Sequence, residues 1–166
     1  YRPGRWSDEQ IAEEHAFAAE LAGQEIPVAS CWPLTVAPDS ARAVRLSSVS
    51  PTLAHIATAD GDYRFSVSTR LGGRAPELED LDTLEWIGRF IGRMHAVGAR
   101  QPFAVRRGLT MDEFGWGCRD WLLEHAHIPP EIAPQWKSAV DAALTLAQQS
   151  FERVPDIHNI RLHGDC

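Results

Sequence analysis

The sequence lacks the features that mark several large protein classes. Its 166 residues carry 16 basic and 23 acidic side chains, a formal net charge of -7, so it has no basic surplus of the kind that binds nucleic acid. Its three cysteines, Cys31, Cys118 and Cys166, are far apart and odd in number. This pattern excludes a disulfide framework or a CxxC zinc site, and we expect free thiols in a reducing cytoplasm.

Long apolar runs are also missing. No stretch approaches the roughly 18 apolar residues of a membrane span, and the N-terminal run Tyr1–Gly4 does not have the form of a signal peptide. We therefore expect a cytoplasmic protein without a membrane segment or a nucleic-acid partner. The hydrophobic fraction of 44% is ordinary for a globular protein, and the length suits one domain or parts of two small lobes.

A capping box opens the first predicted helix. The Ser7 hydroxyl can accept the Gln10 amide while the Gln10 side chain reaches back, so we expect a helix over residues 8–22, ended by Gly23. Its apolar stripe contains Ile11, Ala18 and Leu21 at helical spacing, with Glu14 in the middle. A carboxylate there either meets a cation or reaches water at the edge of the stripe.

Residues 25–67 are expected to form connectors and short strands. Residues 25–29 lead into a strand, and residues 36–60 form a loop-rich insertion that carries weak strands at most. Residues 60–62, Asp-Gly-Asp, predict a hairpin turn. Apolar and polar side chains then alternate over residues 63–67, which predicts a strand.

The glycine pair Gly72–Gly73 is the expected domain boundary, because the sequence is mixed before it and mainly helical after it. A helix is predicted over residues 82–97, with Gly98 as its cap and Gly88 and Gly92 forming a flat packing face. His95 lies near the apolar face and is expected to be a hydrogen-bonded core histidine rather than a ligand. Two further helices follow, one after the capping box at Thr110 and a longer one after Pro129–Pro130.

The last residues carry the most information about chemistry. Residues 160–162 predict a short strand that runs directly into His163, Gly164 and Asp165. A carboxylate at the end of a strand can accept a proton from a hydroxyl or hold a metal. In isolation the three residues favour a plain turn.

Residues 162–166 resemble the start of the catalytic loop L-H-G-D-x-H-x-G-N of the aminoglycoside- and choline-kinase-like superfamily. Segments within residues 13–29, 65–74 and 87–95 resemble other parts of that superfamily in the right order. The run Tyr1–Ser7, Y-R-P-G-R-W-S, makes the chain similar to the stress response kinase A family of bacterial serine/threonine protein kinases. The resemblance covers nearly the whole chain, with residues 36–60 as the exception.

The resemblance implies an α+β, protein-kinase-like fold of two lobes. Residues 1–71 would be the remainder of the N-lobe, with the hinge at its end, and residues 72–166 a helical C-lobe that ends at the catalytic loop. Asp165 would be the catalytic aspartate, and His163 and Gly164 would support its loop.

The resemblance also implies a nucleotide site. Glu14 would pair with the lysine that holds the ATP phosphates, and Glu13 is the fallback for this role. Backbone groups near Ser68 and Arg70 would meet the adenine edge. The complete protein would use ATP and Mg²⁺, but the only lysine here, Lys137, falls in a predicted C-lobe helix, and this chain supplies no metal ligands. We therefore expect the 166 residues alone to be inactive.

Three functions remain open at this point. The first is a kinase that phosphorylates serine or threonine hydroxyls of proteins. The second is a kinase for a small alcohol such as homoserine, choline or an aminoglycoside, for which Asp112, Glu113 and Asp120 could form an acidic pocket or only a solvated helix face. The third is a non-catalytic regulatory protein of kinase shape. The oligomeric state does not follow from the sequence.

Overall fold

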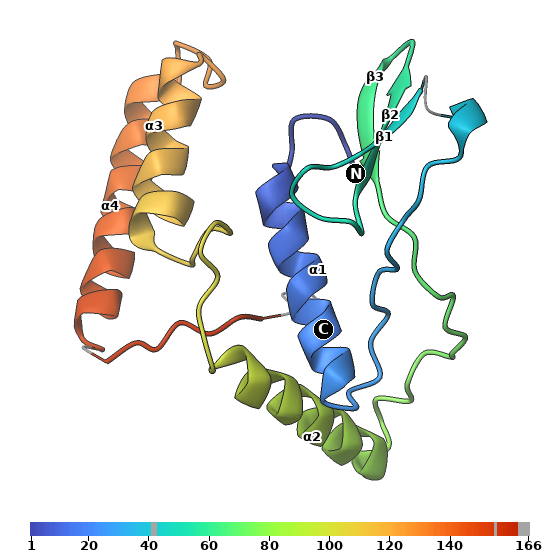
Figure 1. Cartoon of the computed structure of the whole chain (residues 1–166). Helices are drawn as coiled ribbons and strands as arrows, with labels where there is room; N and C mark the ends of the chain where they lie inside the picture. Colours follow the sequence, from blue (N-terminus) through green and yellow to red (C-terminus); the bar gives the residue numbers. More distant parts are fainter. Residues whose placement is uncertain (41–42, 155, 163–166) are drawn as a thin grey trace. The chain divides into compact units, whose positions relative to one another are not determined.

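The computed structural model describes residues 1–40, 43–154 and 156–162, and within it the chain forms two compact units (Figure 1). The first contains Tyr1–Arg106 together with the segment that begins at Ile160, and the second contains Arg107–Asn159. The four helices and the small sheet confirm the α+β class. The units do not divide at Gly72–Gly73, and the assignment of residues 1–71 and 72–166 to two lobes stays a prediction.

Helix α1 spans Asp8–Gly23, and its capping box is confirmed. The Gln10 amide donates to the Ser7 hydroxyl at 3.2 Å, and the Ser7 amide donates to the Gln10 side chain at 3.0 Å. The buried face differs from the predicted stripe, because His15 is buried and Glu14 is exposed. Polar partners for His15 inside the unit remove the penalty that an unpaired buried imidazole would carry.

The predicted insertion carries most of a three-stranded antiparallel sheet, in the order β1-β2-β3. A 3₁₀ helix at Pro38–Ser40 precedes β1, Val44–Leu46, and β2 spans Ala54–Thr58. The hairpin to β3, Gly61–Phe65, is confirmed, and Thr58 pairs with Gly61 across it. Gly61 has a φ of 140°, a conformation that glycine adopts at little cost.

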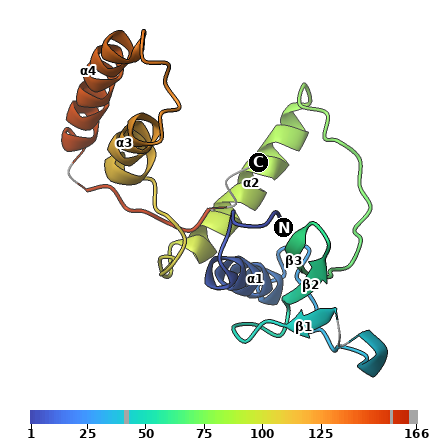
Figure 2. The same cartoon turned by 90° about the horizontal axis from the view of Figure 1, so that it is seen from above.

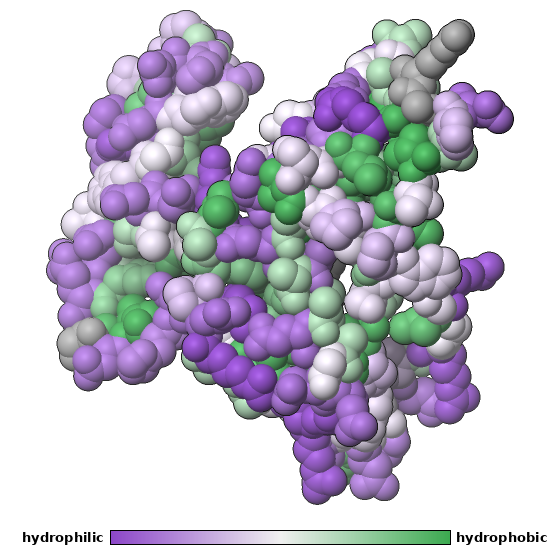
Figure 3. Space-filling view, viewed as in Figure 1, coloured by the Kyte–Doolittle hydropathy of each residue, from purple (hydrophilic) through white to green (hydrophobic). Residues whose placement is uncertain are grey.

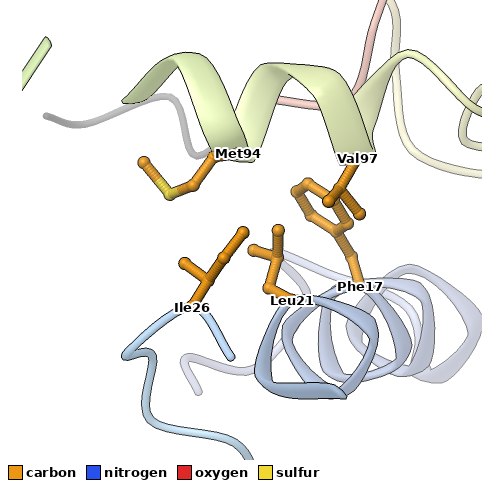
Figure 4. Close-up of a cluster of buried hydrophobic side chains, with 5 residues drawn as sticks. All are labelled: Phe17, Leu21, Ile26, Met94 and Val97. Carbon is orange, nitrogen blue, oxygen red and sulfur yellow. The ribbon is translucent and has the colours of Figure 1, made fainter. Parts of the chain in front are cut away.

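Helix α1 lies between the sheet and helix α2, Leu81–Gly98 (Figures 1 and 2). Its N-terminal half contacts the sheet through polar side chains, and its C-terminal half packs on α2. Five buried side chains from α1, α2 and the connector after α1 form the core: Phe17, Leu21, Ile26, Met94 and Val97 (Figure 4). Helices on either side of Gly72–Gly73 therefore share one core.

Helix α2 differs from the prediction in its N-terminal cap, in the burial of His95 and in the role of two glycines. Asp80, which sequence reasoning missed, caps the helix by accepting the amides of Asp82 and Thr83. His95 is exposed and is not a core histidine. A Cβ added at Gly88 or Gly92 would meet no atom of the described residues within 4 Å, so within this part of the chain the two glycines do not form a packing face.

The second unit is a helical hairpin, seen at the orange end of the colour scale in Figures 1 and 2. A π-helical segment, Asp112–Trp116, continues into α3, Gly117–Glu124, and α4 spans Ala133–Glu152. The cap at Thr110 is present, because its hydroxyl accepts the Glu113 amide at 3.1 Å. Gly115 is buried, and a Cβ there would lie 3.1 Å from the Leu144 side chain, so the two arms approach closely.

Large apolar side chains remain exposed in both units. They include Leu81, Trp86, Phe114 and Leu146. In the space-filling view, apolar side chains accordingly reach the surface among polar ones (Figure 3). The described residues of α3 and α4 include no buried side chain, so the hairpin has a much thinner apolar core than the first unit.

Candidate functional site

The segment that leads into the His-Gly-Asp motif is extended coil and not the predicted strand. A strand needs a ladder of backbone hydrogen bonds, and here one such bond is present, from the Arg161 amide to the Gly98 carbonyl at 3.2 Å. Ile160 is half-buried and Leu162 is exposed. The predicted catalytic residues His163, Gly164 and Asp165 lie outside the described residues.

Arg161 holds this segment against both helices of the first unit. Its side chain is only 5% exposed, and its Nη1 lies 2.8 Å from a carboxylate oxygen of Glu20 on α1. Its Nη2 donates to the carbonyl of Val97 on α2 at 3.1 Å. The guanidinium also lies 4.4 Å from the ring centre of Phe17, a distance at which cation–π attraction operates.

Gly98 allows the backbone of Arg161 to approach α2. A Cβ at position 98 would lie 2.2 Å from the Arg161 carbonyl oxygen, which no side chain can tolerate. The expected role of Gly98 as a helix cap is therefore wrong, since the helix includes it and Ala99 follows in right-handed helical conformation. The glycine serves a close contact between two backbones.

Glu13 is fully engaged by backbone donors. One carboxylate oxygen accepts the amide of Ala104 at 2.5 Å, and the other accepts those of Val105 and Arg106 at 3.0 and 2.8 Å. Burial opposes ionisation of this carboxylate, but the three hydrogen bonds outweigh it, and the pKa of Glu13 lies below its ordinary value. Glu13 therefore ties α1 to residues 104–106, and both its oxygens are occupied.

Glu14 points away from the buried face of α1, so of the two predicted alternatives the structure supports a carboxylate that reaches water outside the apolar stripe. Its side chain is 48% exposed and lies 2.6 Å from Nη1 of Arg106. The Arg106 guanidinium also lies 4.7 Å from the Trp6 ring centre. Glu14 is therefore a solvent-reachable carboxylate whose present partner is an arginine.

The first turn of α1 carries a polar network that sequence reasoning missed. Asp8 accepts hydrogen bonds from Arg64 at 2.5 Å and Ser47 at 2.5 Å, and a ring nitrogen of His55 lies 2.7 Å away. Burial raises the pKa of Asp8, but these partners outweigh burial and hold it well below the usual range. The network joins α1 to the sheet.

His15 forms a second buried link that was not foreseen. One ring nitrogen lies 2.9 Å from the Tyr1 hydroxyl and the other 2.7 Å from the Thr52 hydroxyl. Burial lowers the pKa of His15, so the ring favours the neutral form with one donor and one acceptor. The sequence offered only a histidine beside an acidic pair as a signal.

The residues predicted at the adenine edge follow β3. Ser68 forms an isolated bridge with Cys31, and the Trp32 amide donates to the Val67 carbonyl at 2.8 Å. Ser68 and Arg70 are both exposed. The structure therefore leaves these positions open to solvent, and their proposed contact with adenine stays a prediction.

The acidic residues considered for a cationic substrate lie on an exposed helical surface in the second unit. Asp112, Glu113 and Asp120 are all exposed. Glu113 lies 3.4 Å from Arg107, and Asp120 lies 2.6 Å from Arg119. This arrangement is that of a solvated helix face with ion pairs.

The described residues contain neither a metal-binding cluster nor a membrane-spanning helix. No group of three or more histidine, cysteine, aspartate or glutamate side chains in this part of the chain could hold a metal ion. No described helix is long and apolar enough to cross a membrane.

Comparison with known proteins gives a match over the whole chain. The sequence profile of the phosphotransferase enzyme family matches residues 1–166. The chain is 34% identical over 166 residues to "Stress response kinase A" of Salmonella choleraesuis and to "Serine/threonine protein kinase RdoA" of Salmonella typhimurium LT2. It is 33% identical to "Stress response kinase A" of Escherichia coli K12. Each alignment covers 100% of this chain and 44% of the relative, so the chain spans less than half the length of these proteins.

Proposed function

The chain belongs to the phosphotransferase enzyme family, and from this membership we propose that its complete gene product transfers the γ-phosphate of ATP to serine or threonine hydroxyls of a protein. The observation that carries the proposal is the match over residues 1–166 to relatives named as kinases, in a sequence that retains the His-Gly-Asp motif. We propose the cytoplasm as its compartment, which agrees with the free thiols of Cys31 and Cys118.

Asp165 is the proposed catalytic aspartate. Its carboxylate orients the acceptor hydroxyl and accepts the proton as the hydroxyl oxygen bonds to the γ-phosphorus. The bond from that phosphorus to the β–γ bridging oxygen breaks, and ADP leaves. His163 and Gly164 shape the loop around the carboxylate, and the anchored Arg161 next to the motif supports a fixed origin for that loop.

Glu14 is the proposed partner of a phosphate-holding lysine. Its exposure and its freedom from backbone donors support this choice over Glu13, whose two oxygens are occupied. Glu14 now pairs with Arg106, and a phosphate-holding lysine would have to displace Arg106 from this carboxylate. Backbone groups near Ser68 and Arg70, both exposed after β3, are proposed to meet the adenine edge.

Magnesium would accompany ATP in the complete protein and would neutralise charge on its phosphates. The described residues do not fit a magnesium site by themselves, because they bring together no cluster of three metal-binding side chains.

The 166 residues alone are proposed to be inactive. Lys137, the only lysine, lies on α4 at 2.5 Å from Asp141 and is thereby paired within its own helix. Titration calorimetry of this chain with ATP and magnesium should detect no binding tighter than about millimolar, a free energy near -4 kcal/mol. Micromolar affinity that depends on magnesium would refute this part of the proposal.

The test of the function is phosphotransfer by the complete gene product from γ-labelled ATP to itself or to a protein acceptor. We expect the substitution Asp165→Asn to lower turnover by about 10³-fold while nucleotide affinity stays nearly unchanged. Label found on a small alcohol and not on protein would favour the small-molecule kinase. Wild-type protein without any transfer would favour the non-catalytic alternative.

A further inference from the structure

The side chain of Arg161 is buried in a way that packing alone does not require. The other described residues of the segment from 156 to 162 are exposed, apart from half-buried Ile160, so Arg161 is its main attachment. A guanidinium loses several kcal/mol of solvation on burial, whereas an apolar side chain would pack on Phe17 without that loss. An arginine at this position therefore needs another explanation.

The explanation lies in the geometry of its contacts. The two terminal nitrogens bind different helices, with Glu20 of α1 at 2.8 Å and the Val97 carbonyl of α2 at 3.1 Å. A planar fork with two fixed partners sets the rotation of the side chain as well as its position. Gly98 fixes the position of the Arg161 backbone, because the Arg161 carbonyl oxygen occupies the space that a side chain at position 98 would fill. Arg161 is thus fixed in position and orientation at the entrance to the motif.

We propose that Arg161 is a positioning residue for the proposed reaction: it fixes the chain on α1 and α2 so that the motif that follows presents its carboxylate in one orientation. The inference rests on the proposed function and extends it from the loop to its anchor. Arg161 does not touch substrate in this scheme and acts through Asp165. A merely structural residue at the same place would support folding and leave the chemical step unchanged.

The test compares Arg161→Lys with Arg100→Lys in the complete gene product. Lysine keeps the charge of Arg161 but cannot bind Glu20 and Val97 with a planar fork. Arg100 is the matched control, because its Nη1 also approaches Glu20, at 3.8 Å, and its side chain is 51% exposed. Turnover and nucleotide affinity are measured for both variants, together with the number of nucleotide sites per chain.

We expect Arg161→Lys to lower kcat by about 10²-fold, the cost of a reactive group displaced by about 1 Å, with unchanged nucleotide affinity and site number. Arg100→Lys should match the wild type. Amide hydrogen exchange of residues 160–162 should be faster in Arg161→Lys only. If that variant fails to fold, Glu20→Gln decides in its place, since it removes the charge of the partner and keeps its shape.

An unchanged kcat in Arg161→Lys, beside an inactive Asp165→Asn variant, would overturn the inference and leave the proposed function standing. A fall in kcat that follows an equal loss of nucleotide sites would also overturn it, because that result marks a folding role. Full turnover in Asp165→Asn would instead overturn the proposed function, and the positioning role with it.

Discussion

Helix α1 and the α3–α4 hairpin are held in place by different kinds of contact. The partners of Asp8 lie 39 to 56 residues away in the sequence, and the partners of Glu13 lie 91 to 93 residues away. In the hairpin, the hydrogen bond between Arg119 and Asp141 spans 22 residues. Helix α1 is therefore tied to distant segments, and the hairpin to itself.

Helix α1 and the hairpin also differ in how many of their side chains are buried. Four residues of α1 are buried, Ile11, His15, Phe17 and Leu21, whereas the described residues of α3 and α4 include none. Short helices gain most of their stability from tertiary packing rather than from helix propensity. The position of α1 should therefore depend on a few specific side chains, and the hairpin should tolerate substitution.

The largest effect predicted by this contrast is for Arg161→Ala. Within the described part of the chain, the substitution leaves the Glu20 carboxylate with only Arg100 at 3.8 Å and the Val97 carbonyl with only backbone amides, including that of Arg100, and we expect a loss of about 4 kcal/mol in the free energy of unfolding. Arg119→Ala, which removes the main ion pair of the hairpin, should cost less. Urea denaturation followed by amide exchange in each unit separates the two effects, and equal losses would contradict the contrast.

A second prediction concerns apolar packing. Ile11 is 1% exposed, and Ile11→Ala should lower the free energy of unfolding by about 3 kcal/mol because it leaves a cavity. Leu144 on α4 is half-buried, and Leu144→Ala should cost about 1 kcal/mol. The measurement is the denaturant concentration at the midpoint of unfolding, compared between variants whose unfolding free energy depends equally steeply on denaturant. A costlier loss at Leu144 would show that the hairpin has the firmer core.

A third prediction uses pH. The folded-state pKa of Asp8 is depressed, because the hydrogen bonds from Arg64, Ser47 and His55 outweigh the opposite effect of burial. Its stabilising contribution is therefore complete above the unfolded pKa of about 3.9 and is lost as the pH falls toward the folded value. Asp8→Asn should lower the free energy of unfolding by about 2 kcal/mol at pH 7. Below about pH 4 the free energy of unfolding should then fall less steeply with pH than in the wild type.

The matched variant for pH is Asp141→Asn. Hydrogen bonds from Lys137 and Arg119 lower the pKa of Asp141. Like Asp8, Asp141 therefore stabilises the folded state above its unfolded pKa and loses this contribution as the pH falls. We expect a smaller change, because both partners come from the hairpin itself and Lys137 is half exposed. An Asp8→Asn variant with wild-type acid sensitivity would remove Asp8 from this account.

Local patterns predicted the elements well. The capping box at Ser7, the alternation after Gly61 and the helical spacing after Pro130 lie in neighbouring residues, and each predicted an element of the right kind, although β3 begins at Gly61, two residues earlier than expected. Asp80 was missed as a cap because several acidic residues stand near it in the sequence. The strand expected at residues 160–162 failed because a strand requires a partner, and the single backbone bond to Gly98 does not provide a ladder.

The polar links of α1 could not be predicted in the same way. Periodicity placed Glu14 among the apolar residues, but it does not register that a neighbouring histidine can be buried when two hydroxyls satisfy it. Glu13 and Arg161 each depend on contacts between segments far apart in the chain. For Arg161 the available signal was a charged residue between two apolar ones just before the motif.

The smallest predicted effect compares the capping box at Ser7 with the single hydrogen bond at Thr110. Ser7 takes part in both reciprocal bonds with Gln10, and Ser7→Ala should cost about 1 kcal/mol because the Gln10 amide loses its acceptor in the first turn of α1. Thr110 accepts one amide on an exposed helix end, and Thr110→Ala should cost about half as much. Ser7→Gly serves as the control, because glycine is a fair cap and should recover most of the loss. If Thr110→Ala lowers the free energy of unfolding more than Ser7→Ala does, local capping matters more to the hairpin than to α1. In that case α1 owes its stability to its distant partners more than to its cap.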